Sequence, residues 1–143
     1  MTQVNRSALV LHSAHQMFEI VNDVLAYPEF LPWCASTELL YEDEHKMEAT
    51  LYLAKAGLKY SFTTRNQLIR SERIELELIE GPFSKLSGIW TFVPLNDEAC
   101  KVSLSLGFEF EGKLKSIAMG KVFNQVATTL VDAFVQRADK VYG

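Results

Sequence analysis

The sequence has few cysteines and no long apolar run. Its 143 residues include only two cysteines, Cys34 and Cys100. This number does not support a disulfide framework, so each thiol is expected to be reduced and packed as a small hydrophobe. No stretch approaches the ~18 to 20 consecutive apolar residues that a membrane-spanning helix needs. The N-terminal segment lacks the apolar stretch and cleavage site of a signal peptide, and we therefore expect a cytoplasmic protein.

An excess of positive charge is missing as well. The chain has 14 Lys and Arg against 18 Asp and Glu, which gives a net charge of -4. General nucleic-acid-binding proteins normally have a basic balance, so DNA is not an expected partner, although a local basic patch stays open. No repeat, low-complexity tract or linker divides the chain. We therefore expect a single domain over residues 1–143.

The common sequence motifs of enzymes are also absent. There is no G-x-S-x-G, H-E-x-x-H, P-loop or G-x-G-x-x-G pattern. The three histidines, His12, His15 and His45, fall beside the first helix or in a polar turn, and we expect exposed imidazoles. Nothing positions a base for Cys34 as a nucleophile. We predict no catalytic residue, no metal site, no cofactor and no enzymatic activity.

The first 30 residues carry the signals of a strand followed by short helices. Val4, Ala8 and Val10 share one face of a period-2 segment, as in a strand. Ser13 and Gln16 have the spacing of a capping box, and apolar residues follow at intervals of three and four. This helix must end before Pro28.

Alternation of apolar and polar residues dominates from Met47 to Phe110 and predicts an antiparallel meander. The last 30 residues contain no proline. Their apolar residues recur at helical spacing: Leu114, Ile117, Ala118, Val122, Val126, Leu130, Phe134 and Ala138. We therefore predict an α+β helix-grip fold, in which a curved antiparallel sheet wraps around a long C-terminal helix at about 112–141. Two short helices follow the first strand.

Four separate segments carry a family resemblance. They read "VNDVLAYPEFLPWC", "KAGLKYSFTTRNQL", "GPFSKLSGIWTF" and "FEFEGKLKSIAMGKVF". In this order they resemble the coenzyme Q-binding branch of the START-like superfamily, whose bacterial members are also known as ribosome association toxins. The resemblance extends over essentially the whole chain.

The resemblance implies two competing functions. The first is a non-enzymatic carrier of an isoprenoid quinone, ubiquinone or a related lipid, which supports respiration and could involve peripheral contact with a membrane. The alternative is a toxin that docks on the large ribosomal subunit, blocks its joining to the small subunit and so inhibits the initiation of translation. A cyclase-like enzyme is a third and weaker hypothesis, because the interior-facing rows offer no obvious acid or base.

A ligand cavity between the last helix and the sheet is the site that the resemblance implies. Periodicity alone does not distinguish a filled core from a cavity, so both interpretations stay open for each residue. The predicted lining is apolar and comes from the sheet and the helix: Phe62, Trp90, Phe92, Leu106, Phe108, Val122, Val126 and Leu130.

The stretch "YPEFLPWC" supplies a candidate lid for this cavity. Its apolar residues, Tyr27, Phe30, Leu31 and Trp33, would close the open end of the fold, and two prolines would hold the loop in shape. A lid predicts that Trp33 is partly exposed. The alternative is that these residues simply fill the end of the core.

A small basic patch is predicted at the start of the last helix. Lys113, Lys115 and Lys121 lie where the helix dipole disfavours positive charge. Either these lysines point into solvent, or they contact phosphates of a membrane lipid or of ribosomal RNA.

Overall fold

The structure is a computed structural model that describes the backbone of residues 1–143 and every side chain except those of residues 113–116. The elements follow in the order β1 (Thr2–Val10), α1 (Ala14–Asn22), the 3-10 turn η1 (Val24–Ala26), α2 (Tyr27–Phe30), β2 (Cys34–Glu42), β3 (Lys46–Lys55), β4 (Leu58–Ile69), β5 (Arg73–Glu80), β6 (Phe83–Asn96), β7 (Ala99–Phe110) and α3 (Lys113–Tyr142).

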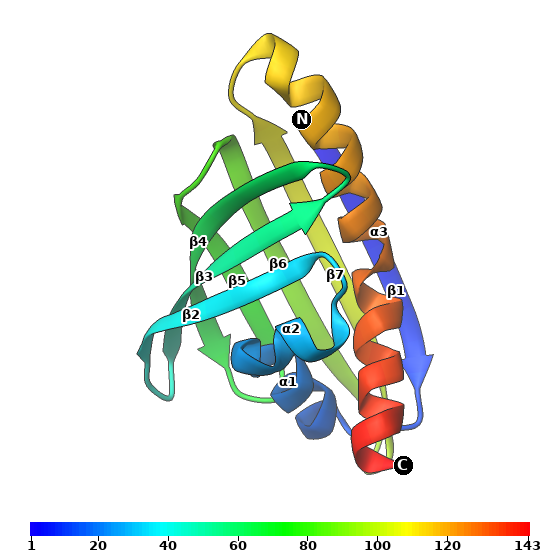
Figure 1. Ribbon diagram of the computed structural model, residues 1–143. Coiled ribbons are helices and arrows are strands. Elements are labelled where there is room, and N and C mark those ends of the chain that lie inside the picture. Colours follow the sequence, from blue (N-terminus) through cyan, green and yellow to red (C-terminus); the bar gives the residue numbers. More distant parts are fainter.

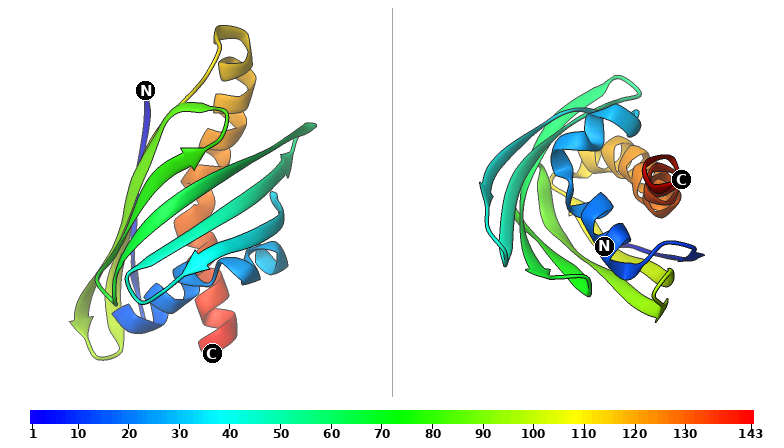
Figure 2. Two further views of the ribbon diagram at one scale, coloured as in Figure 1. Left: turned by 90° about the vertical axis from the view of Figure 1, so that its left-hand side faces the viewer. Right: turned by 90° about the horizontal axis from the view of Figure 1, so that it is seen from below.

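Within this described chain, seven strands form one sheet in the order β1-β7-β6-β5-β4-β3-β2. Every neighbouring pair is antiparallel. Figure 1 shows α3 running along the sheet, and the view from below in Figure 2 shows the sheet curving around α3 and the short helices. The predicted helix-grip fold is confirmed.

The short helices begin and end where the local sequence dictates. The Ser13 hydroxyl accepts a hydrogen bond from the Gln16 N–H, while the Gln16 side chain accepts one from the Ser13 N–H, so the capping box is formed. Pro28 lies in the first turn of α2, where a proline needs no N–H. Pro32 follows α2 and prevents its continuation.

The helix α3 is one continuous element, as predicted, but its buried face starts later than expected. Ile117 is 73% exposed and Ala118 is also exposed, although the apolar spacing of the helix includes both, so the expectation that this spacing marks a row facing the sheet is wrong for Ile117. Among the described residues of α3, full burial begins with Phe123, whose ring lies edge-on against Phe108 at 4.7 Å between centroids. The helix starts beyond the end of β7 and runs back along the sheet, so its early turns have little sheet to cover (Figure 1). Leu114 lies outside the described side chains.

The concave face of the sheet holds the core, and the convex face is polar. Alternate residues of the strands point inward and are buried, as in β7, where Val102, Leu104 and Leu106 are at most 4% exposed. On the outer face the Arg65 guanidinium pairs with Glu48 at 3.1 Å and with Glu77 at 3.5 Å. Among the described residues, no helix is both long and apolar enough to cross a membrane.

Candidate functional site

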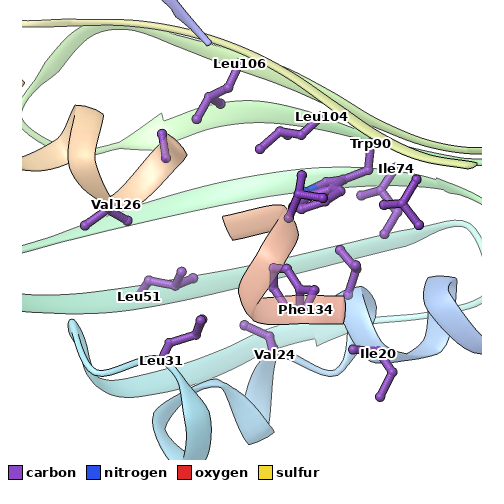
Figure 3. Close-up of a cluster of buried hydrophobic side chains, with 14 of the residues drawn as sticks. Ile20, Val24, Leu31, Leu51, Ile74, Trp90, Leu104, Leu106, Val126 and Phe134 are labelled. Atoms are coloured by element: carbon purple, nitrogen blue, oxygen red, sulfur yellow. The ribbon is translucent and has the colours of Figure 1, made fainter. Parts of the chain in front are cut away.

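A pocket of about 90 Å³ lies between α3 and the concave face of the sheet. Figure 3 shows side chains of α3, the sheet and the short helices around this interior. The residues that line the pocket come from every layer of the fold: Val24, Tyr27, Trp33, Met47, Ala49, Leu51, Phe62, Thr64, Asn66, Leu76, Leu86, Trp90, Leu106, Phe123, Val126, Leu130 and Phe134.

Strand register brings the sheet residues of the pocket together. Asn66 of β4 pairs with Met47 of β3 on one side and with Leu76 of β5 on the other. Leu76 pairs in turn with Gly88, and Gly88 with Leu106. Paired residues in an antiparallel sheet point to the same face, so this row crosses the pocket floor. At Gly88, an added Cβ would lie 2.7 Å from the Leu106 side chain, which would have to shift to make room for it.

The structure places five predicted cavity residues in this pocket: Phe62, Trp90, Leu106, Val126 and Leu130. The other three, Phe92, Phe108 and Val122, are not among the described residues that line it. Phe92 packs edge-on against Phe18 of α1, with 5.8 Å between ring centroids. Phe108 lies beneath Phe123, the neighbour of Val122 that α3 turns toward the sheet. Phe92 and Phe108 therefore belong to the filled core beside the pocket, whereas Val122 is only partly buried and is not part of that core.

The segment from Tyr27 to Cys34 places aromatic rings beside the pocket, and Tyr27 and Trp33 line it. The ring of Tyr27 lies edge-on to Phe134 at 5.3 Å between centroids, and its hydroxyl donates a hydrogen bond to the Val21 carbonyl. Phe30 is half-buried beside the same Phe134 ring, under the Arg137 guanidinium.

Leu31 and Trp33 are more deeply buried than expected for residues of a mobile lid. Leu31 is 1% exposed, and Trp33 is 6% exposed while it lines the pocket. The expectation that Trp33 is partly exposed is therefore wrong, because its ring faces the interior instead of the loop surface. Whether the segment opens as a lid stays a prediction.

Titratable groups beside the pocket are held in their neutral forms. Burial raises the pKa of the Tyr27 phenol, and the nearby Cys34 and Asp23 raise it further. Burial also raises the pKa of the Cys34 thiol to about 11. At neutral pH the thiol therefore stays protonated, which is the opposite of what a cysteine nucleophile needs.

Two polar residues project into this apolar interior. Thr64 is 6% exposed and Asn66 is 8% exposed, and both line the pocket. Sequence reasoning missed them, although a signal was present. Phe62, Thr64, Asn66 and Leu68 alternate on one face of β4, so the row that carries Phe62 inward carries both polar side chains with it.

The other candidate groups lie away from the pocket. His12 is only 8% exposed and its Nε2 lies 2.6 Å from an Asp139 carboxylate oxygen, so the expectation of an exposed imidazole is wrong for this residue. The strand that precedes α1 brings His12 against the end of α3, where the imidazole also packs near Tyr142. Among the described residues, no group of three or more His, Cys, Asp or Glu gathers as a metal site.

The predicted basic patch is described only in part. Lys121 is exposed on α3. The side chains of Lys113 and Lys115 lie outside the described residues, so the patch stays a prediction.

Comparison with the sequences of known proteins gives three findings. The sequence matches the family described as polyketide cyclase/dehydrase and lipid transport over residues 10–135. A Vibrio cholerae protein named ribosome association toxin RatA is 50% identical over 143 residues, which are 100% of this chain and 99% of that protein. The Xenopus laevis protein named mitochondrial coenzyme Q-binding protein COQ10 homolog B is 26% identical, and the match covers 99% of this chain but 59% of that protein.

Among solved structures, the Zhui aromatase/cyclase from Streptomyces superposes with a TM-score of 0.87 at 20% identity. The match covers 99% of this chain and 96% of the aromatase/cyclase. At this identity the likeness concerns the fold.

Proposed function

The chain belongs to the polyketide cyclase/dehydrase and lipid transport family, in the branch of the ribosome association toxins, and from this premise we propose that it acts on the ribosome. In this proposal it docks on the large ribosomal subunit and blocks its joining to the small subunit. The observation that carries the proposal is the 50% identity, over the full length, with a protein named ribosome association toxin.

The chemistry of the site supports a binding role over a catalytic one. None of the described residues that line the pocket is ionised at neutral pH, because the pKa of Tyr27 is raised and the others are apolar or neutral. Acid–base catalysis needs a group that exchanges a proton near the working pH. We therefore propose that the protein is not an enzyme.

Sedimentation of ribosomal particles tests the ribosomal proposal. Purified large and small bacterial subunits are mixed under conditions that favour association, with increasing amounts of the protein. We expect free subunits to increase at the expense of joined particles, with the protein in the large-subunit fractions. Phe134→Asp is the matched control, because it places a charge in the core and unfolds the domain. Unchanged association at saturating protein would overturn the proposal.

A second candidate function is the binding of a neutral apolar molecule, and the pocket favours it. The pocket lies between the sheet and α3 and has an almost entirely apolar lining. The similarity to a coenzyme Q-binding protein and to a lipid transport family supports the same function. The pocket volume of about 90 Å³ is small, since sites for drug-sized ligands measure roughly 300 to 1,000 Å³. An isoprenoid quinone therefore has to displace side chains to enter.

Mass spectrometry of organic extracts from the purified protein tests this second function. We expect a stoichiometric neutral lipid, with ubiquinone as the first candidate. Extracts that contain no such molecule, from protein purified without detergent, would count against the carrier hypothesis and leave the ribosomal proposal untouched.

A further inference from the structure

One polar group in the pocket lacks a partner. The Oδ1 atom of Asn66 is fully shielded from solvent and has no hydrogen-bond partner among the residues that the structure describes. A buried acceptor without a donor is unfavourable, so such groups are uncommon in folded proteins and each one calls for an explanation. The Asn22 Oδ1 and the Tyr60 hydroxyl also lack a partner among the described residues, but neither residue lines the pocket.

The neighbours of Asn66 in the sheet do not satisfy this oxygen. Its partners in the sheet register, Met47 and Leu76, have no side-chain donor. The phenol of Tyr27 lines the same pocket, but its hydrogen is already donated to the Val21 carbonyl.

We propose that Asn66 accepts a hydrogen bond from a hydroxyl group of a neutral, otherwise apolar ligand, and that this bond selects among molecules that fit the pocket. The proposal rests on the second candidate function, the binding of an apolar molecule. The ligand carries a donor because the free atom is an acceptor. It is neutral because the pocket offers no ionised group to offset the desolvation of a charge.

The position of Thr64 supports a polar subsite on β4. Thr64 precedes Asn66 by two residues, so its side chain points to the same face, and it lines the same pocket. The rest of the described lining is apolar apart from the polar tips of Tyr27 and the two tryptophans. A ligand would therefore place its hydroxyl end toward β4 and its apolar body against α3.

The proposed bond distinguishes alcohols, phenols and hydroquinones from quinones. The carbonyl oxygens of a quinone ring only accept hydrogen bonds, so a quinone does not pair with Asn66 Oδ1 and would bind Asn66 only if the carboxamide turned to present its Nδ2–H. The hydroxyl groups of a hydroquinone can donate to Asn66 Oδ1. The pocket is thus expected to prefer the reduced form of such a ring.

Two small probes of nearly equal shape test the assignment. In para-cresol a hydroxyl replaces one methyl group of para-xylene, and the rest of the molecule is the same. Both tryptophans of the chain, Trp33 and Trp90, line the pocket, so indole fluorescence excited at the red edge of its absorption reports occupancy. Ligand-observed NMR gives an independent affinity for each probe.

The ratio of the two affinities is compared between the natural chain and Asn66→Leu, which replaces the carboxamide by an apolar group of similar size. We expect the preference for para-cresol over para-xylene to fall by about five- to tenfold. Gln67→Leu is the matched control, because the exposed Gln67 is the next residue of β4 and points to the opposite face. It should leave the ratio unchanged. Asn66→Ala repeats the test with a smaller side chain if the leucine variant folds poorly.

Two outcomes overturn the assignment in different ways. If both probes bind and the ratio is the same in the natural chain and in the Asn66 variants, the pocket binds apolar molecules but Asn66 does not select a hydroxyl. If neither probe binds the natural chain, the second candidate function fails together with the assignment.

Discussion

At the scale of single residues, Asn66 carries a cost in stability that a binding role would explain. Its Oδ1 is buried without a partner among the described residues. We predict that Asn66→Leu raises the free energy of unfolding by about 1 to 2 kcal/mol, because it removes an unsatisfied polar group and keeps the volume filled. Urea unfolding measures the change. Gln67→Leu, on the exposed face, should stay within about 0.5 kcal/mol. A less stable Asn66→Leu protein would mean that the carboxamide is a structural group.

Within the "YPEFLPWC" stretch, the structure changes the expectation for Trp33, which was predicted to be partly exposed. A partly exposed Trp33 could be removed at little cost, but its actual exposure is 6%. We therefore predict that Trp33→Ala lowers the free energy of unfolding by about 3 to 5 kcal/mol, as is typical for a core aromatic residue. Urea unfolding gives the value. A loss below about 1 kcal/mol would show that the segment detaches easily and would favour the lid.

At the scale of elements, period and capping signals identify most helices and strands. Alternation places β3 to β7, and Ser13 with Gln16 marks the start of α1. The face of α3 is harder to predict, because the same apolar spacing continues to Ile117, where the sheet no longer lies opposite. A residue pattern records which side of a helix is apolar, but it does not record how far the neighbouring layer extends.

The first turns of α3 allow a test of the predicted basic patch. Replacing Lys113, Lys115 and Lys121 by Gln should weaken association with large ribosomal subunits and flatten its dependence on salt. The physical reason is that fewer counterions are released when fewer lysines meet phosphates. Co-sedimentation at several salt concentrations measures both effects. Lys140→Gln, a single change in the last turn of the same helix, is the control. An unchanged salt dependence in the triple variant would assign the three lysines to a solvated face.

At the scale of the whole molecule, the sequence allows a more complete prediction of the fold than of the candidate site. The order of elements and the family resemblance are enough to predict the helix-grip fold. The pocket depends on the curvature of the sheet and on the volumes of side chains from distant segments, which no local pattern records. Phe92 and Phe108 belong to the same inward-facing rows as Trp90 and Leu106, yet they pack against Phe18 and Phe123 in the filled core. The apolar pattern does not mark Asn66, because its carboxamide interrupts the apolar residues on the inner face of β4.

As proposed, the two candidate functions would use different parts of the molecule, so one substitution should separate them. Val126 is 2% exposed and faces the pocket from α3. We predict that Val126→Trp fills the pocket and abolishes the binding of para-cresol and para-xylene in ligand-observed NMR. Overpacking should cost about 1 to 3 kcal/mol of stability, so the fold persists. Docking on a ribosomal subunit depends on the surface, and the variant should still reduce subunit joining in sedimentation experiments.

Val141→Trp is the matched control for this separation, because it adds the same indole to an exposed position of α3. It should retain both activities. If a folded Val126→Trp protein still binds the probes, the ligand site lies elsewhere. If it loses the ribosomal effect together with probe binding, the two functions are not independent. The state of the pocket would then control docking, because a filled interior changes how α3 and the sheet present their surface to the ribosome.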